Sequence, residues 1–247
     1  RDSPISLCNM FRNPRITTDL ALKYLKYVLS RRKKFFLFIH YWATHTPYYT
    51  LRNYFKKLKS AKDMLMPSNV RDSSLQSILR SIGNPYWRKY LTTWFKGAKL
   101  LNVSDVVLTY YASLLAVDKE LGRLIKFLRE QGIIDKVMII ITADHGESLG
   151  EHGIYFDHHG LYEVSIRVPL VLYYENLGKK KAKGTALHTD IAPTILHVTC
   201  NKKNKYINGY DLFNLLDEDL RSDLPLVFVE TYTQTKIGVI YGNYKYI

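Results

Sequence analysis

An aspartate, a histidine and a glycine follow almost directly after a short apolar run in this chain of 247 residues. The run, Val137 to Thr142, is too short for a typical helix and is typical of a buried β-strand. Ligands of open α/β sheets bind beyond the carboxyl ends of the strands, where Asp144 and His145 would lie. Their oxygen and nitrogen donors suit a divalent cation. We expect Gly146 to let the backbone turn sharply beside them.

More titratable side chains follow within a few residues of this pair. From Asp144 to His159 the sequence holds four histidines, two aspartates and two glutamates. A solvated loop rarely concentrates imidazoles in this way, and such clusters indicate metal or anion chemistry. A strand followed by an ordinary polar turn is the alternative for Asp144, His145 and Gly146 taken alone.

The rest of the sequence predicts alternating helices and strands that would position this cluster. We expect helices over residues 17–30 and 105–131, two or three short helices between 50 and 104, and a helix from the cap Asp190 to Val198. The apolar runs predict buried strands, and the last residues predict a hairpin. The strands are Phe35–Ile39, Val137–Thr142, Leu170–Tyr174 and Leu226–Val229, and the hairpin is Lys236–Tyr241 with Tyr244–Ile247.

Several motifs, in one order along the chain, resemble the sulfatase family of the alkaline phosphatase superfamily. The longest runs from Asp144 to Gly153 and reads Asp-His-Gly-Glu-x-x-Gly-Glu-His-Gly. The others are a strand ending in His-x-Pro-Tyr (Phe35–Tyr48), the helix before the metal strand (Tyr110–Gly122), His-x-Gly-Leu-Tyr-Glu (His158–Glu163), Arg-Val-Pro-Leu (Arg167–Leu170) and Asp-x-x-Pro-Thr (Asp190–Thr194).

The resemblance implies the fold and its division. It implies an α/β, alkaline-phosphatase-like, three-layer sandwich, with a mainly parallel central sheet flanked by helices. We expect this domain to occupy residues 1–235 and the start of a small C-terminal β subdomain to occupy 236–247.

The resemblance also implies roles for the histidines. Asp144 and His145 would bind one side of the metal, and His45 would contact the ester or leaving-group oxygen. His45 could instead be a strand-end histidine with an ordinary backbone partner. His158 stands where many sulfatases carry a lysine that contacts the sulfate, and His159 is the register alternative. A histidine there resembles the branch that includes phosphonate and phosphodiester hydrolases.

Other residues of these motifs are assigned to supporting positions. Glu147 is expected to orient His145 from outside the metal's ligands, and Arg167 to anchor the loop before the next strand. His152 is interpreted as structural or as a support of the ligands. Asp190 is interpreted as a helix cap rather than a metal ligand. His188 matches no sulfatase ligand and is left unassigned.

The resemblance implies one divalent metal and a nucleophile. The family favours Ca²⁺, and the softer imidazole ligand also admits Mn²⁺ or Zn²⁺. The sulfatase nucleophile is a formylglycine made in a Cys-x-Pro-x-Arg motif, whereas the phosphatase branches use Ser or Thr. Cys8 has Met10 where that motif has Pro. Cys8 also lies only a short way before the strand expected to begin at Phe35, whereas the family's nucleophile lies far earlier in the chain. We therefore expect the nucleophile and the remaining ligands to come from an N-terminal segment missing from this sequence.

Composition limits the partners. The chain is 47% hydrophobic, as globular proteins are, and its formal net charge is +14. The basic residues are dispersed between apolar segments, which favours a solvated surface over a nucleic-acid site. No apolar run reaches the roughly 20 residues of a membrane span. The expected partner is a small anionic ester.

These observations predict a metal-dependent sulfate ester hydrolase. The alternatives are a phosphodiester or phosphonate monoester hydrolase, or a phosphoglycerol-type transferase, of the same superfamily. An inactive fragment or a basic binding module is the non-enzymatic alternative.

Overall fold

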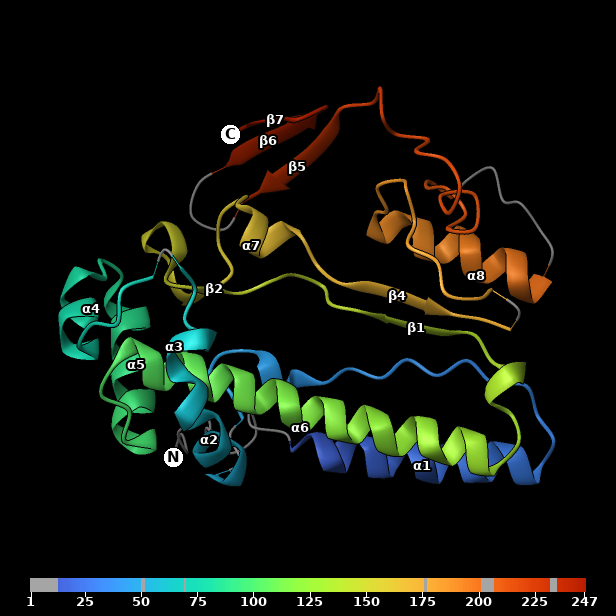
Figure 1. Ribbon diagram of the computed structural model, residues 1–247, viewed down its shortest axis with the longest axis horizontal. Helices are drawn as coiled ribbons and strands as arrows, with labels where there is room; N and C mark the ends of the chain where they lie inside the picture. The colour runs from blue at the N-terminus through green and yellow to red at the C-terminus, as the bar shows by residue number, and fades with distance from the viewer. Residues whose placement is uncertain (1–12, 50–51, 69, 176, 201–206, 232–234) are drawn as a thin grey trace, which may run out of the picture. The chain divides into compact units, whose positions relative to one another are not determined.

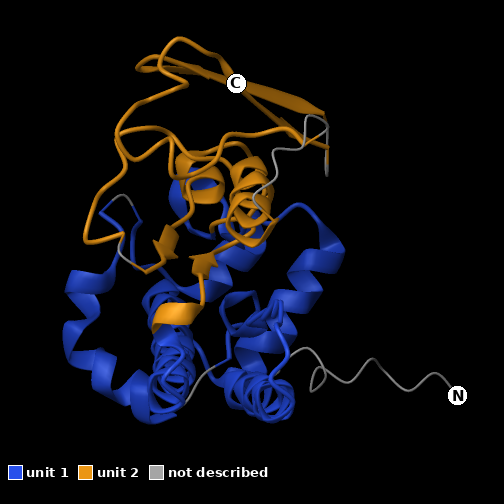
Figure 2. Ribbon diagram, turned by 90° about the vertical axis from the view of Figure 1, so that its right-hand side faces the viewer, with its two compact units in different colours: residues 1–134, 147–157 blue, residues 135–146, 158–247 orange. Residues whose placement is uncertain are grey.

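The computed structural model describes residues 13–49, 52–68, 70–175, 177–200, 207–231 and 235–247. The chain forms two compact units, and its path passes between them more than once. Unit 1 comprises residues 1–134 and 147–157, and unit 2 comprises 135–146 and 158–247 (Figure 2). The Asp144–His145 pair belongs to unit 2, whereas Glu147 begins the segment that returns to unit 1.

Unit 1 is mostly helical (Figure 1). Helix α1 (Pro14–Ser30) begins where Asn13 Oδ1 accepts from the backbone N–H of Arg15 at 3.0 Å, and Pro14 occupies its first turn. Helix α6 (Val103–Glu130) is capped by Asp105, whose carboxylate accepts from the backbone N–H of Asn102. The other elements of the unit are η2 (Trp42–Thr44), α2 (Arg52–Leu58), η3 (Lys59–Ala61), α3 (Lys62–Leu65), α4 (Leu75–Ser81), α5 (Pro85–Ala98), β2 (Ser148–Leu149), η5 (Glu151–Gly153) and β3 (Tyr155–Asp157).

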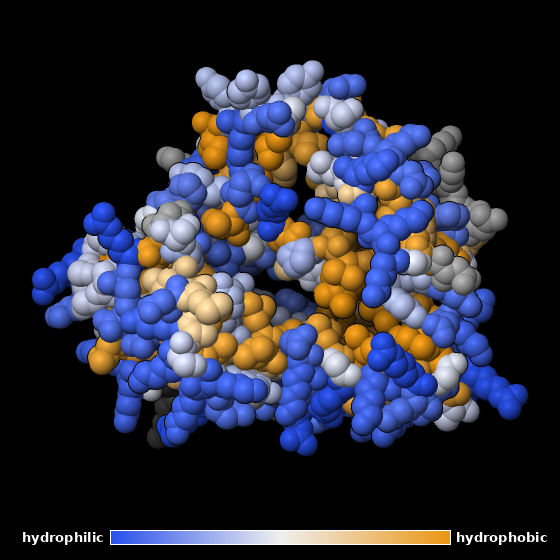
Figure 3. Space-filling model, in the orientation of Figure 1, coloured by the Kyte–Doolittle hydropathy of each residue, from blue (hydrophilic) through white to orange (hydrophobic). Residues whose placement is uncertain are grey.

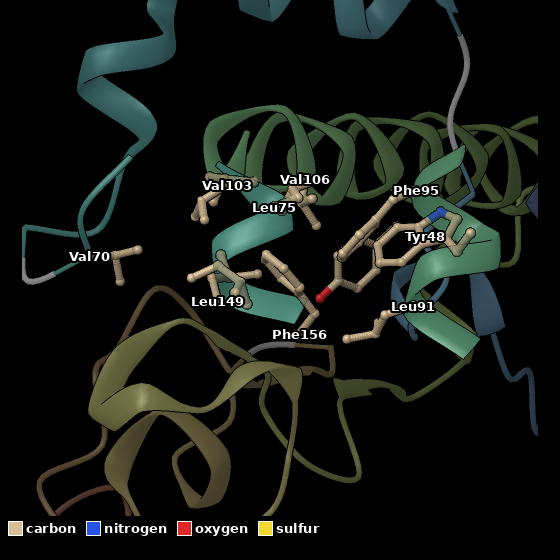
Figure 4. Close-up of a cluster of buried hydrophobic side chains, with 12 residues drawn as sticks. Tyr48, Val70, Leu75, Leu91, Phe95, Val103, Val106, Leu149 and Phe156 are labelled. Carbon is tan, nitrogen blue, oxygen red and sulfur yellow. The ribbon is translucent and has the colours of Figure 1, made fainter. Parts of the chain in front are cut away.

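The core of unit 1 joins its helices to the returning segment 147–157. Phe156 of β3 is fully buried, and its ring meets the rings of Trp94 and Phe95 of α5 edge to face. Tyr48 also contacts Trp94 edge to face, at 5.3 Å between ring centroids. Figure 4 shows Tyr48, Phe95 and Phe156 together in this cluster. Burial of large aromatic side chains dominates core energetics. The β2–β3 hairpin is therefore fixed on the helices rather than left as a surface loop.

Unit 2 contains the strand that carries the Asp-His-Gly motif. Strand β1 (Ile139–Thr142) pairs antiparallel with β4 (Leu170–Tyr173), with Thr142 opposite Leu170. Strands β5 (Leu226–Glu230), β6 (Lys236–Tyr241) and β7 (Tyr244–Tyr246) form a second, antiparallel sheet in that order. The helical elements are α7 (Glu163–Ile166), η6 (His188–Asp190) and α8 (Ile191–Cys200), and the short η4 (Ile134–Lys136) leads into the unit.

The structure confirms the long helices, the strand before Asp144, the strand after Pro169 and the C-terminal hairpin. The expected burial of the two strands is wrong, because β1 and β4 are half-buried to exposed. The buried strand expected at Phe35–Ile39 is wrong. No strand is assigned there, and Phe36 and Phe38 are 70% and 79% exposed. A strand needs a hydrogen-bonded neighbour, and no described strand pairs with this segment. The predicted boundary between the main domain and the C-terminal β subdomain at residue 235 stays a prediction. Strand β5, which lies before this boundary, pairs with β6, which lies after it.

The expected parallel pairing is also wrong for the strands that the structure describes, because all their ladders are antiparallel. The apolar character of β1 indicated a buried strand, but an apolar run does not encode the direction of its partner.

Charged side chains lie on the surface of the helical unit. Hydrophilic residues line the edge that carries α1 and α6, at the bottom of Figure 3. Among the described residues, no helix combines the length and the apolar character needed to span a bilayer.

Candidate active site

Asp144 and His145 lie just beyond the end of β1, as the sequence predicts. The Thr142 hydroxyl donates to the carbonyl of Pro169 at 2.9 Å and so ties the end of β1 to the start of β4. His145 Nδ1 lies 2.8 Å from the carbonyl oxygen of Gly146, which can only accept, so Nδ1 is the donor. In the neutral ring Nε2 then carries the lone pair. A backbone-held tautomer of this kind is typical of metal-binding histidines.

The positions of the two side chains suit a shared cation. His145 Nε2 lies 3.6 Å from Asp144 Oδ2. Two ligand atoms that are each roughly 2.1 Å from a tetrahedral ion lie about 3.4 Å apart, so the observed spacing needs little adjustment. The Asp144 side chain is 72% exposed and that of His145 is 32% exposed, which leaves both accessible. One carboxylate oxygen and one imidazole nitrogen fit a divalent metal of intermediate softness.

Gly146 is required for a different reason from the one expected. Its φ is not positive, so the turn does not need glycine's conformational freedom. Instead the backbone passes close to α7. A Cβ at Gly146 would lie 1.9 Å from the carbonyl oxygen of Val164, and the Gly146 N–H donates to the carbonyl of Ser165 at 2.7 Å. Gly146 therefore lets α7 hold the motif through direct backbone contact.

His158 lies against the Asp144–His145 pair within unit 2. Its ring stacks on that of His145, with 3.9 Å between centroids and 24° between planes. The two histidines offer ligand atoms within 4.8 Å of each other. The His159 ring lies at a tilt against the His158 ring, with 5.2 Å between their centroids. The local geometry therefore favours His158 over His159 as the histidine that lies beside Asp144 and His145.

His45 belongs to unit 1, where aromatic and backbone contacts hold its ring. The ring stacks on Trp42 at 4.4 Å between centroids, and its Nδ1 lies 2.6 Å from the carbonyl oxygen of Thr46. That carbonyl also accepts from the Tyr90 hydroxyl at 3.0 Å. His45 is half-buried and has the ordinary backbone partner that the alternative interpretation expected. This contact still leaves Nε2 as the acceptor atom of the neutral ring.

Glu147 organises the segment that carries His45. Its Oε1 accepts from the Thr46 hydroxyl at 2.7 Å and from the Tyr48 hydroxyl at 2.6 Å, and the Thr46 hydroxyl also contacts the carbonyl of Phe156 at 2.9 Å. The role predicted for this glutamate, orienting His145, stays a prediction. The observed hydrogen bonds show a carboxylate that fixes the His-x-Pro-Tyr motif.

Tyrosines with raised pKa values surround this carboxylate. Burial, and then the charge of Glu147, raise the pKa of Tyr90 to about 12 and that of Tyr110 to about 12. The same causes raise the pKa of the fully buried Tyr48 well above its usual range. These hydroxyls therefore remain donors or neutral neighbours at physiological pH. The sequence assigns neither Tyr90 nor Tyr110 a role at the site: Tyr110 is only the start of the Tyr110–Gly122 helix motif, and nothing distinguishes Tyr90 among 20 tyrosines.

The remaining predicted residues have structural surroundings. His152 is exposed in η5 with φ of 56°, and the neighbouring Glu151 is buried and accepts from the backbone N–H of Leu149 at 2.6 Å. The backbone N–H of Arg167 donates to the carbonyl of Glu163 at 2.9 Å at the end of α7. The anchoring role expected for Arg167 stays a prediction.

Two further expectations concern Asp190 and Cys8. The Asp190 carboxylate accepts from the backbone N–H of Leu187 at 2.7 Å at the start of η6, as a cap does. Cys8 lies outside the described residues. Arg12 stands four residues after it, so this segment has the motif's Cys-to-Arg spacing but Met10 in place of the proline.

Comparison with known sequences identifies the family of this arrangement. The sulfatase family model matches residues 4–201. The N-acetylglucosamine-6-O-sulfatase of Bacteroides thetaiotaomicron is 32% identical over 158 residues, 62% of this chain and 27% of that protein. The multifunctional alkaline phosphatase superfamily protein PehA of Trinickia caryophylli is 28% identical over 239 residues, 90% of this chain and 45% of that protein. The chain thus spans less than half the length of either relative.

Solved structures show the same fold. BT4656, solved in complex with its substrate D-glucosamine-2-N,6-O-disulfate, matches with a TM-score of 0.69 at 20% identity, over 94% of this chain and 60% of that one. The putative sulfatase yidJ from Bacteroides fragilis matches with a TM-score of 0.64 at 21% identity, over 93% and 47%. These likenesses confirm the predicted α/β, alkaline-phosphatase-like fold class.

Proposed function

The chain belongs to the sulfatase family, and from that premise we propose that the full-length protein is a metal-dependent hydrolase of sulfate esters. The observation that carries the proposal is the arrangement around Asp144 and His145 at the end of β1. Their ligand atoms lie 3.6 Å apart, and His158 stacks directly on the His145 ring. A cation site beside a second imidazole suits an ester that is anionic at its reacting centre.

We assign Asp144 Oδ2 and His145 Nε2 to the metal. When bound, the cation would polarise the ester and activate the nucleophile. The hydrogen bond from His145 Nδ1 to the carbonyl of Gly146 sets the tautomer that this ligand needs. The family favours Ca²⁺, and the imidazole ligand also admits Mn²⁺ or Zn²⁺.

We assign His158 to the oxyanion of the ester and His45 to its leaving-group oxygen. His158 stands where the family's sulfate-contacting side chain stands, and its place against His145 supports this role. The assignment of His45 rests on its motif and on the hydrogen bonds that hold Thr46 and Tyr48 beside it. His159 remains the alternative to His158 for the anion.

The nucleophile is not assigned to a residue of this sequence, because no Cys-x-Pro-x-Arg motif occurs among its 247 residues. The proposal therefore concerns the full-length protein. Its substrate class is a sulfated sugar, because the relative from Bacteroides thetaiotaomicron is an N-acetylglucosamine-6-O-sulfatase.

A phosphodiester or phosphonate monoester hydrolase is the second candidate. It is favoured by the similarity to a multifunctional member of the superfamily over 90% of this chain, and by a histidine, rather than a lysine, at position 158. Imidazole holds an anion by hydrogen bonding without the fixed charge of an ammonium group. Strict preference for sulfate is therefore not part of the proposal.

The test measures metal content and turnover in the full-length protein. The substrates are N-acetylglucosamine 6-sulfate, 4-nitrophenyl sulfate and bis(4-nitrophenyl) phosphate. We expect Asp144→Asn to lose the metal and His158→Ala to lose at least about 100-fold in kcat/KM for the preferred ester. His197→Ala is the matched control, because His197 lies on α8 and pairs with Asp211. A wild-type protein that binds no divalent metal and cleaves none of the three esters would refute the proposal.

A further inference from the structure

We propose that His188 is a positioning residue that holds the Asp144–His145 pair in its metal-binding orientation, an inference that rests on the proposed function. Its Nε2 lies 2.8 Å from the carbonyl oxygen of Ala143, the residue directly before Asp144. A carbonyl only accepts, so Nε2 is the donor. His188 stands in η6, 45 positions from Ala143 in the sequence, and the two meet only through the folding of unit 2.

The turn that carries His188 is held by a buried ion pair. The Asp190 side chain is fully buried, and its Oδ1 accepts from Arg221 Nη2 at 2.5 Å and from the backbone N–H of Tyr210 at 2.8 Å. Its Oδ2 accepts from the backbone N–H of Leu187 at 2.7 Å. A buried carboxylate with these partners cannot move without losing charge-assisted hydrogen bonds. The position of His188 is therefore determined independently of the loop that it contacts.

Contacts on the other side of the turn restrict it further. Arg221 Nη1 donates to the carbonyl of Thr185 at 2.8 Å, and the Arg221 guanidinium lies 4.5 Å from the centroid of the Tyr210 ring. At Gly209 an added Cβ would lie 2.2 Å from the carbonyl oxygen of Thr189, so the two backbones are in direct contact. The η6 turn is thus held on both sides, and the His188 ring projects from a rigid base.

Hydrogen bonds hold the segment that His188 contacts at both of its ends. Its ends are tied, by the Thr142 hydroxyl to the carbonyl of Pro169 and by the Gly146 N–H to the carbonyl of Ser165. Between these ends, His188 Nε2 reaches the carbonyl oxygen of Ala143 at 2.8 Å. Asp144, with a side chain 72% exposed, follows directly. Fixing the Ala143 peptide limits the directions in which Asp144 and His145 can point.

Loss of this link should weaken metal binding rather than unfold the protein. Partners that orient a ligand from outside the coordination shell typically change metal affinity by about 10- to 100-fold when they are removed. His188 is itself exposed, so its replacement leaves no cavity in the core. We expect His188→Ala to weaken binding by about tenfold, and His188→Gln, whose amide nitrogen can donate from a similar place, to recover most of the affinity.

The experiment uses the metal-stripped full-length protein, with Mn²⁺ as the probe and its free concentration followed by electron paramagnetic resonance. The second readout, which needs no metal, is hydrogen exchange of the His145 and Gly146 amides. We expect both readouts to change in His188→Ala and to return towards wild type in His188→Gln. The control His197→Ala replaces another histidine of unit 2, 52% exposed, and should change neither.

The outcomes separate this inference from the proposed function. Equal Mn²⁺ affinity and equal amide exchange in wild type and His188→Ala would overturn the positioning role, as would a His188→Gln variant no better than His188→Ala. A wild-type protein that binds neither Mn²⁺ nor any other divalent cation would overturn the proposed function. Faster exchange in His188→Ala alone would in that case still support the link between His188 and Ala143.

Discussion

Replacing Gly146 by alanine tests whether backbone contact with α7 determines the geometry of Asp144 and His145. The new Cβ would lie 1.9 Å from the carbonyl oxygen of Val164, and ordinary contact begins at 3.4 Å, so the two segments must separate by about 1.5 Å (3.4 − 1.9). The obstacle is a backbone carbonyl, which no side-chain rotation can remove. The displacement therefore passes directly to Asp144 and His145.

The magnitude has two contributions. Overpacking of a closely packed site typically costs about 1–3 kcal/mol. The separation also breaks the hydrogen bond from the Gly146 N–H to the carbonyl of Ser165, worth about 1 kcal/mol. We therefore expect a loss of roughly 3 kcal/mol in the free energy of unfolding, which in a domain of this size lowers Tm by roughly 6–12 °C. A misplacement of about 1 Å near reacting groups can cost about 100-fold in rate.

The assay is chemical unfolding together with Mn²⁺ binding of the full-length protein. Gly122→Ala is the matched control, because Gly122 lies within α6 and no heavy atom lies within 4 Å of its added Cβ. That control should keep the wild-type metal affinity and should gain up to about 1 kcal/mol, since alanine favours the helix. A Gly146→Ala protein with wild-type unfolding and wild-type Mn²⁺ affinity would show that α7 does not position the motif.

Three further predictions concern stability. Arg221→Met leaves the fully buried Asp190 without its cation and should lower the free energy of unfolding, measured in urea, by about 3–5 kcal/mol. Adding Asp190→Asn should recover part of this loss, and a loss below about 1 kcal/mol would contradict the buried ion pair. Ser165→Ala should be neutral or stabilising by about 1 kcal/mol, because its buried hydroxyl has no hydrogen-bond partner within the described part of the chain, and a clear loss of stability would reveal a partner. Burial, and then the charge of Glu147, raise the pKa of Tyr110 from 10.0 to about 12. The stability that Tyr110 contributes is therefore fully present below about pH 10 and is lost as the pH rises to about 12. Tyr110→Phe should flatten that part of the profile of unfolding free energy against pH, and an unchanged alkaline slope would argue against the raised pKa.

The sequence alone determined the features that depend on neighbouring residues. The periodicity of α6 acts within a few helical turns, so it could be read directly. The start of α1 was placed at residue 17, whereas the helix begins at Pro14 behind the cap Asn13. The abrupt end of an apolar run at Asp144–His145 likewise predicted where β1 stops. The order of motifs was sufficient to identify the family.

Only the tertiary structure decided the features that join distant parts of the chain. Gly146 contacts Val164 through backbone atoms, which a preference for turns does not reveal. His188 reaches Ala143 across 45 positions, and no local pattern encodes that approach. The apolar run at Phe35–Ile39 forms no strand within the described residues, because strand formation depends on a partner supplied from elsewhere. Local propensity and periodicity reach a few residues along the chain, whereas backbone contact, strand direction and the support of ligands depend on packing between segments that the sequence separates.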